Sequence, residues 1–284
     1  RVRERSPVVS SNSGVGILWG RSVRRLVEDL GARVRGALAT AGEMASLLFL
    51  SLRSIAALVG PSSRVVARVA LRQVYFTGNQ ALPLTGLIAF LLGAVVVIQA
   101  VTRLSGLGAE GFAGDILVIA VLRELGPLVA AVIVIGRSGT AMAAELATMR
   151  LRGEIEDLDT LGIDPVQYLV LPRIAGAIVS LFGLMVFFDL LAVVGGYVAL
   201  GSQTMTPVRS YVDSILQAIQ PRDLALIPAK AVLFGGMIAA FGCYRGLSVE
   251  ASPTEIPRAA TRGVVMSLVG IFVADSILAT LVYS

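Results

Sequence analysis

The chain has 284 residues, of which 56% are hydrophobic and only 15% are charged. Ordinary soluble domains carry about 25% charged residues, so this composition excludes a soluble globular protein and indicates an integral membrane protein. The net charge is +5, and all but one of the 24 basic residues are arginine. These arginines flank apolar runs, which is typical of membrane topology rather than of nucleic-acid binding. With no histidine and with Cys243 as the only cysteine, disulfides and Cys/His metal sites are excluded.

Residues 1–80 are expected to form an N-terminal cytoplasmic and interfacial segment. Residues 14–75 within it are predicted to form arginine-rich amphipathic helices that lie on a membrane surface. Met44–Gly60 is too short to span, because its charge-free run ends before Arg53. Packing of these helices on the spans remains an open alternative. No cleavable signal peptide is expected, because the early segment lacks a charge-free core followed by a small-residue site.

Five later runs are apolar and long enough to cross a bilayer, which takes about 20 residues. They cover about 84–101, 116–141, 168–200, 224–244 and 263–283. The predicted fold class is therefore an all-α integral membrane protein. It has N-terminal interfacial amphipathic helices, five transmembrane helices and a cytoplasmic coupling helix between the second and third spans.

The arginines predict the orientation of these spans. With a cytoplasmic N-terminus, ten arginines flank the inner side: Arg64, Arg68, Arg72, Arg137, Arg150, Arg152, Arg173, Arg245, Arg258 and Arg262. Only Arg103, Arg209 and Arg222 lie in the outer loops. By the positive-inside rule, the N-terminus is predicted inside and the C-terminus outside.

The segment 143–165, "AAELATMRLRGEIEDLDTLGIDP", is predicted to form the coupling helix, at about residues 143–163. Leu151, Ile155, Leu158 and Gly162 share one helical face, and Arg150, Glu154 and Asp157 share another. Asp164-Pro165 is a good start for the next helix. Two interpretations remain open, a solvated connector and a docking helix for a soluble partner. On the docking interpretation the contact residues are Glu145, Met149, Arg150, Leu151, Glu154, Ile155, Asp157 and Leu158.

Ionisable residues inside spans are candidate functional or structural sites. Lys230 and Asp275 are predicted to form an intramembrane structural pair, because each alone would cost several kcal/mol. Arg123-Glu124 precedes Gly126-Pro127, where proline removes a backbone donor. This pair is interpreted either as part of a substrate path or as a buried pair between helices. Asp189 has no evident partner in the sequence.

Several motifs resemble the MlaE/YrbE-type permeases, the membrane subunits of MCE-associated ABC lipid transporters. They are "RELGP" (123–127), "GRSGTAMAAELATMR" (136–150), "LGIDPVQYLVLPR" (161–173) and "ATRGVVMSLVGIFVAD" (260–275), with Lys230 as the family's intramembrane lysine. Residues 81–284 would form the permease domain. The sequence departs from the family at "LFGLM" (181–185) and at Asp189.

The resemblance implies a homodimer with a cytoplasmic ABC ATPase dimer, a periplasmic ring of MCE-domain protein and a STAS-type accessory protein. It implies a bacterial inner membrane, or the equivalent organelle envelope membrane, and passage of phospholipid or a similar lipid. The implied path residues are Leu92, Val96, Gln99, Arg123, Glu124, Leu125 and Leu128. No cofactor is expected on this chain, since it lacks a P-loop motif, and ATP with Mg²⁺ is expected on the ATPase. No nucleic-acid partner and no enzymatic activity of the chain itself are expected.

Two other functions are considered. An ion-coupled secondary transporter would use Glu124, Lys230, Asp275 and Asp189 as a proton relay, but five spans do not divide into two equal repeats. A non-transporting membrane anchor would leave the intramembrane charges without a purpose. Copurification of an ATPase would distinguish the ATP-driven lipid permease from both of these alternatives.

Overall fold

The computed structural model describes residues 71, 73–104, 113–201, 207–249 and 252–283, and among these there are helices and no strands. The chain divides into two compact units, Arg1–Ser46 and Leu47–Ser284, and every described residue belongs to the second. The amphipathic helices predicted before residue 71 lie outside the described residues.

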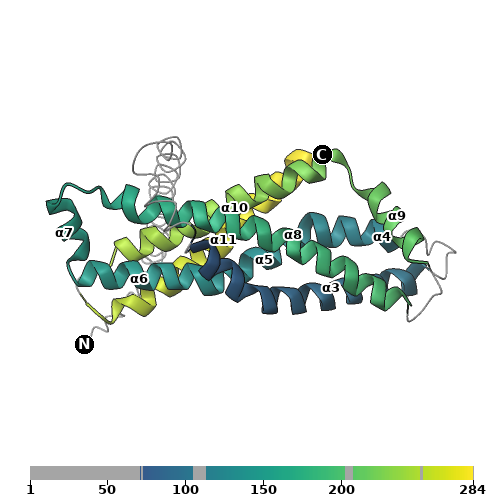
Figure 1. The fold of residues 1–284 in the computed structure, drawn as a ribbon, viewed down its shortest axis with the longest axis horizontal. Coiled ribbons are helices and arrows are strands. Elements are labelled where there is room, and N and C mark those ends of the chain that lie inside the picture. Colours follow the sequence, from purple (N-terminus) through teal and green to yellow (C-terminus); the bar gives the residue numbers. More distant parts are fainter. Residues whose placement is uncertain (1–70, 72, 105–112, 202–206, 250–251, 284) are drawn as a thin grey trace, which may run out of the picture. The chain divides into compact units, whose positions relative to one another are not determined.

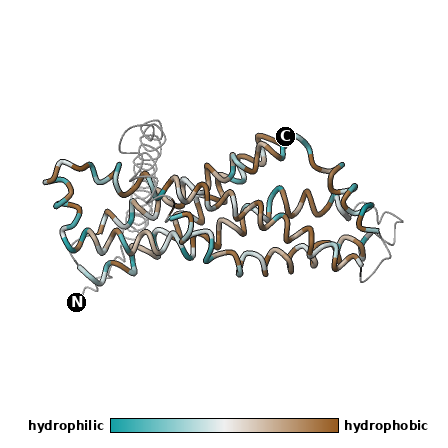
Figure 2. Tube along the Cα trace, in the orientation of Figure 1, coloured by the Kyte–Doolittle hydropathy of each residue, from teal (hydrophilic) through white to brown (hydrophobic). Residues whose placement is uncertain are grey.

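The five predicted spans are confirmed as helices that are long and apolar enough to cross a membrane. They cover Tyr75–Arg103, Gly114–Leu151, Val166–Gly201, Pro221–Leu247 and Glu255–Val282 (Figure 1). Each is longer than the apolar window that predicted it, and the first begins inside the segment that the sequence assigned to the N-terminal region. Figure 2 shows hydrophobic residues along these helices.

The spans are built from regular and π-helical pieces. The first consists of η2 (Tyr75–Asn79) and α3 (Gln80–Leu104), and the third of η7 (Val166–Val170) and α8 (Leu171–Gly201). The fourth and fifth are α10 (Pro221–Leu247) and α11 (Glu255–Tyr283). The second contains α4 (Ala113–Leu117), η5 (Val118–Leu125), α5 (Gly126–Val134), η6 (Ile135–Gly139) and α6 (Thr140–Leu151). Its two π segments matter because π-helical turns are frequent at functional sites.

The tightest helix pair is α3 against α8. A Cβ added to Gly93 would lie 2.0 Å from the carbonyl oxygen of Ala192, and one on Gly195 would lie 2.0 Å from that of Phe90. Only glycine therefore permits this approach, in agreement with the use of small residues between helices in membranes. These two contacts fix α3 and α8 as one unit.

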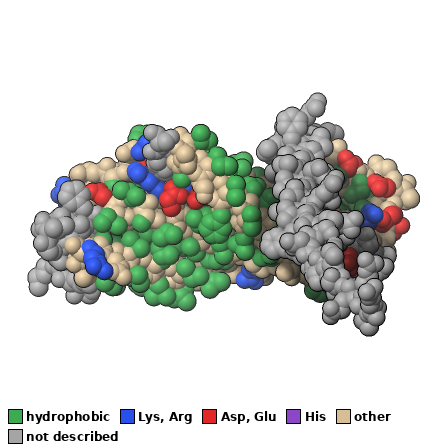
Figure 3. Space-filling model, turned by 180° about the vertical axis from the view of Figure 1, so that it is seen from behind, with side chains coloured by type: hydrophobic (Ala, Val, Ile, Leu, Met, Phe, Trp, Pro, Cys, Tyr) green, Lys and Arg blue, Asp and Glu red, His purple; other side chains and the backbone are tan. Residues whose placement is uncertain are grey.

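Two hydrophobic clusters fill the interior. One joins parts of α3, α5, η6, α6, α7 (Glu154–Thr160), η7, α8, α10 and α11, and the other joins parts of α3, α4, η5, α8 and α9 (Val208–Ala218). Large hydrophobic side chains also remain exposed, including Leu91 and Val95 on α3 and Val269 and Phe272 on α11. Figure 3 shows an extensive hydrophobic surface on one face. Exposed apolar faces on spanning helices are expected in lipid, where every backbone polar group is satisfied within the helix.

The amphipathic helix α9 lies between the third and fourth spans. Its Tyr211 is buried, and the Tyr211 hydroxyl donates a hydrogen bond to the carbonyl oxygen of Val193 at 3.2 Å. Burial raises the pKa of Tyr211, so the hydroxyl keeps its proton at neutral pH. This bond anchors α9 to α8.

Candidate functional site

The second span changes from π-helical to α-helical geometry where η5 passes into α5. Pro127 has no N–H to donate to the carbonyl oxygen of Arg123, four residues earlier. The Lys230 ammonium of α10 donates to this oxygen at 2.8 Å. The carbonyl oxygen to which Pro127 cannot donate in one span therefore accepts a hydrogen bond from a charged side chain of another, which links η5 to α10.

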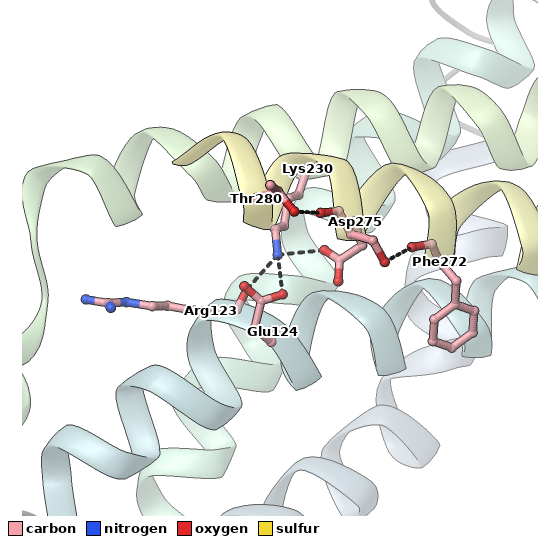
Figure 4. A network of polar contacts seen from close by, with 7 residues as sticks. Arg123, Glu124, Lys230, Phe272, Asp275 and Thr280 are labelled. Carbon is pink, nitrogen blue, oxygen red and sulfur yellow. Dashed lines mark hydrogen bonds and ion pairs between the residues drawn. The ribbon is translucent and has the colours of Figure 1, made fainter. Parts of the chain in front are cut away.

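The same lysine is the centre of a charge cluster, defined here as Glu124, Lys230 and Asp275. Lys230 Nζ lies 3.0 Å from Glu124 Oε2 and 2.7 Å from Asp275 Oδ1. Figure 4 shows the three side chains converging from η5, α10 and α11. The Lys230 side chain is only 2% exposed, so the cluster joins the second, fourth and fifth spans inside the protein. The structure brings together the two residues that the sequence paired, and adds Glu124 to them.

Arg123 does not share this cluster, although it is adjacent to Glu124 in sequence. Its guanidinium lies 2.9 Å from Asp223 Oδ2 and donates to the carbonyl oxygen of Ala218 at 3.2 Å. Figure 4 shows its side chain directed away from Lys230. Asp223 also accepts a hydrogen bond from the backbone N–H of Gln220 at 2.8 Å, which completes a capping box at the start of α10. Arg123 thus joins η5 to the junction of α9 and α10.

Asp223 is a site residue that the sequence pattern did not predict. The signal available was local, because Gln220-Pro221-Arg222-Asp223 has the proline and the acid of a helix start. Nothing in that pattern indicates that the same carboxylate pairs with a residue 100 positions away.

Asp189, which the sequence left without a partner, lies on α8 against Gly126 of the second span. It is buried, and a Cβ added to Gly126 would lie 2.7 Å from its Oδ1. Gly126 therefore provides the space that this carboxyl group occupies. This space explains how Asp189 fits between the two spans.

The other residues predicted for the lipid path fall into separate surroundings. Leu92 and Val96 are partly buried and pack against the cluster formed by α3, α4, η5, α8 and α9. Leu128 packs against the other cluster, whereas Gln99 and Leu125 are exposed. Their prediction as path residues stays a prediction.

The predicted coupling helix at 143–163 is divided in the structure. Residues 143–151 continue the second span as α6, and α7 covers only Glu154–Thr160. Gly153, with φ of 76°, separates the two helices, and Gly162, with φ of 74°, follows α7. Both glycines have a backbone conformation that side chains with a Cβ disfavour. The start predicted at Asp164-Pro165 agrees with the structure, since Asp164 Oδ1 accepts a hydrogen bond from Val166 N at 2.9 Å.

The apolar face predicted for partner docking instead packs inside the chain. Ile155 is 5% exposed and belongs to the core, and Leu158 and Met149 pack against the same cluster. Leu151 packs against a small cluster with Ala147 and Ala259. Much of this apolar face therefore covers the protein's own core, and its role in partner docking stays a prediction.

The exposed side of this connecting segment, defined here as residues 152–165, is acidic with an apolar tip. Glu156, Asp157 and Asp159 are exposed, and Leu161 is 73% exposed. Acidic side chains gather at the right of Figure 3, at the end that carries α7. The surface available to a partner therefore includes Leu161 and the acids that precede it.

Ion pairs hold the connecting segment and its neighbours in place. Arg173 at the start of α8 lies 3.0 Å from Glu145 of α6, and Arg150 lies 3.0 Å from Glu156 across the turn. Arg152 and Glu154 form a more exposed pair at 3.6 Å. Because Arg173 is nearly buried, the pair with Glu145 ties the second span directly to the third.

The described residues thus form five helices that are long enough to span a membrane, with an internal charge cluster and an exposed acidic connection between the second and third of them. The family model for Permease MlaE matches residues 70–281. A probable ABC transporter permease protein of Rickettsia prowazekii is 34% identical over 213 residues, which are 75% of this chain and 82% of that protein.

Two further relatives come from Synechocystis sp. and Arabidopsis thaliana. A probable ABC transporter permease protein of Synechocystis sp. is 30% identical over 223 residues, which are 78% of this chain and 84% of the relative. The chloroplastic protein TRIGALACTOSYLDIACYLGLYCEROL 1 of Arabidopsis thaliana is 31% identical over 213 residues, which are 75% of this chain and 61% of that protein. The chain belongs to the MlaE permease family and is a permease subunit of an ABC transporter.

Proposed function

We propose that this chain moves phospholipid or a similar lipid across or out of its membrane, driven by ATP that a separate ATPase chain hydrolyses. The family and the names of its relatives support the ATP-driven class, because an ABC permease implies an ATPase partner. The Arabidopsis relative is named after a diacylglycerol lipid, which supports lipid as the transported molecule.

The observation that carries this proposal is the attachment of the connecting segment to two spans. The ion pair between Glu145 and Arg173 joins α6 to α8, and the core packing of Ile155 fixes α7 beneath them. A force applied to the exposed face of α7 would reach the second and third spans together. The second span carries Arg123 and Glu124, so the same force would reach the charge cluster.

The proposed assembly contains two copies of this chain, a cytoplasmic ATPase dimer and a periplasmic ring of MCE-domain protein, with a STAS-type accessory protein. It lies in the bacterial inner membrane or the equivalent organelle envelope membrane. These partners and this location follow from the family resemblance.

The proposal is tested by purifying the tagged chain from its native membrane and measuring lipid transfer from the reconstituted complex. We expect an ATPase subunit to copurify, and transfer of labelled phospholipid to acceptor vesicles to require ATP and Mg²⁺. A proton ionophore should leave this transfer unchanged. Transfer that proceeds without ATP and stops with the ionophore would instead support the secondary transporter.

The proposed orientation places the N-terminus in the cytoplasm and the C-terminus in the periplasm, as the arginine distribution predicts. Ser210 lies on α9 after three spans, and Ser252 lies after four, so they are expected on opposite sides. In a Cys243→Ala background, an impermeant thiol reagent applied outside should label Ser210→Cys and not Ser252→Cys. Labelling should become equal after the membrane is permeabilised. If only position 252 were labelled in intact cells, the protein would have the opposite orientation in the membrane.

A further inference from the structure

Asp189 is an acid in the interior of the third span that has no partner among the described residues. Only 8% of it is exposed, and its Oδ1 atom is buried without a hydrogen-bond partner in that part of the chain. None of the described arginines and lysines forms an ion pair with it. An ionised carboxylate in an apolar interior is costly unless a cation or several hydrogen-bond donors compensate it. The charge of Asp189 must therefore be removed, or matched by something that binds to it.

The charged groups on α8 and on the helices around it are engaged in other contacts. Arg123 of η5 pairs with an acid of α10, and Lys230 of α10 pairs with both acids of the charge cluster. Arg173 at the start of α8 pairs with α6, and the Tyr211 hydroxyl of α9 donates to α8. The helix α5 carries no charged residue, and α3 carries none before its last turn. The compensation of Asp189 therefore has to come from outside these pairs.

The polar atom closest to the Asp189 carboxyl group across the contact with η5 is an acceptor. Asp189 Oδ1 lies 2.7 Å from the position of a Cβ added to Gly126, and the carbonyl oxygen of Val121 lies 3.0 Å from the same position. This carbonyl accepts the backbone N–H of Gly126, and its second lone pair can accept another hydrogen bond. A carboxylate has no donor and would face this oxygen unfavourably, whereas a protonated carboxyl group has an O–H to donate.

We propose that Asp189 is a proton-binding site: its carboxyl group holds one proton and donates the O–H to a backbone carbonyl of η5, with that of Val121 beside it. The neutral acid then links the third span to the second without a cation. Because Glu124 follows Val121 by three residues, Asp189 acts as a positioning residue for the segment that carries the charge cluster. The proton stays in the fold and is not exchanged during transport, so this role goes beyond the proposed function and does not rest on it.

A hydrophobic carbodiimide gives the direct test, because it adds to protonated carboxyl groups. The carboxyl proton moves to one carbodiimide nitrogen, the carboxyl oxygen bonds to the central carbon, and the adduct rearranges to a stable N-acylurea without a leaving group. Asp189 is the only acid in the tryptic peptide 174–209, and Asp223, which is equally buried but paired with Arg123, is the only acid in 223–230. The site of any label is therefore unambiguous.

The full-length, detergent-purified chain is treated with dicyclohexylcarbodiimide at neutral pH in choline chloride. We expect the peptide with Asp189 to carry at least fivefold more label than the peptide with Asp223, because only Asp189 lacks a cation. Label on Asp189 no higher than on Asp223 would overturn the proposal. Protection of Asp189 when Na⁺ replaces choline would show that a metal cation, and not a proton, occupies the site, and would also overturn it.

Infrared spectroscopy tests the same point without a reagent that must enter the protein. The difference spectrum between the unmodified chain and Asp189→Asn at neutral pH should contain the C=O band of one carboxylic acid, and this band should shift in heavy water. Carboxylate bands in its place would overturn the proposal, whatever the result of the labelling.

A glycine substitution tests where the O–H points. Gly126→Ala places a methyl group against Asp189 Oδ1 and should displace the carboxyl group from η5, so the acid band should move. Gly136→Ala is the matched control in the same span, because nothing lies within 4 Å of its added Cβ, and it should leave the band in place. An unchanged band in monodisperse Gly126→Ala protein would contradict the hydrogen bond to η5.

Asp189→Asn distinguishes a fixed proton from a transported one. The amide keeps a donor toward the carbonyl and carries no charge, so the reconstituted variant should retain its Tm and transfer lipid within twofold of the unmodified complex. A folded variant that loses transfer would show that Asp189 must release its proton, and would overturn the proposal. Failure of the unmodified complex to transfer lipid would refute only the proposed function, since the label and the infrared band do not depend on transport.

Discussion

Replacement of Lys230 by methionine is expected to destabilise the protein more than any other single change in the charge cluster. The substitution removes the cation that lies 3.0 Å from Glu124 and 2.7 Å from Asp275, and leaves two carboxyl groups facing each other. It also removes the donor to the Arg123 carbonyl oxygen beside Pro127. Loss of one partner of a buried ion pair costs about 3–5 kcal/mol. We expect little folded Lys230→Met protein, with a Tm in detergent lower by roughly 10 °C.

Neutralising the acids provides the matched comparison. Glu124→Gln leaves the well-buried pair of Lys230 with Asp275, so it should be the mildest change. Asp275→Asn leaves Lys230 with Glu124, whose side chain is more exposed, and should be intermediate. We therefore expect the Tm, measured by size-exclusion chromatography after heating, to be highest for Glu124→Gln, lower for Asp275→Asn and lowest for Lys230→Met.

Combined variants separate the effect of an unpaired charge on stability from the effect of losing the lysine side chain. The double variant Lys230→Met, Asp275→Asn still contains Glu124 without its cation, so it should recover only part of the loss. Adding Glu124→Gln removes the last charge, and the triple variant should be more stable than Lys230→Met alone. A triple variant no more stable than Lys230→Met would contradict the electrostatic explanation and would attribute the defect to the lost hydrogen bond at Arg123.

Leu161→Asp is expected to abolish association with the ATPase while the permease remains folded. Leu161 follows α7, is 73% exposed and has the exposed acids of the connecting segment beside it. Buried apolar anchors at the centre of an interface often contribute 2 kcal/mol or more, about a thirtyfold loss of affinity. We therefore expect copurification of the ATPase to fall at least tenfold, with Tm of the permease changed little.

Two controls distinguish docking from folding. Leu216→Asp places the same charge at an exposed leucine of α9, far along the chain from the connecting segment, and should retain the ATPase. Leu158→Asp places it against the core, so it should lower Tm as well as ATPase binding. Full retention of the ATPase by Leu161→Asp would refute the docking assignment, and an equal loss with Leu216→Asp would indicate a general defect.

The apolar runs by themselves predicted the five spanning helices that the described residues form, and their order. Each spanning helix satisfies its own backbone hydrogen bonds, so about 20 apolar residues are sufficient to specify it. The pairing of Lys230 with Asp275 could also be predicted from the sequence, because an isolated charge in a span is costly and the spans contain few opposite charges. The start of the third span at Asp164-Pro165 was predictable for the same local reason, since the cap is made by a neighbouring residue.

Tertiary structure decided the features that depend on which faces of the helices meet. Adjacent Arg123 and Glu124 point to different neighbours, because side chains one residue apart on a helix diverge by about 100°. Amphipathicity revealed the apolar face of α7 but not whether a partner or the chain's own core covers it, and Ile155 and Leu158 pack on the core. The turn at Gly153 and the contact of Asp189 with Gly126 likewise arise from how the elements meet in space, which no periodicity along one helix can encode.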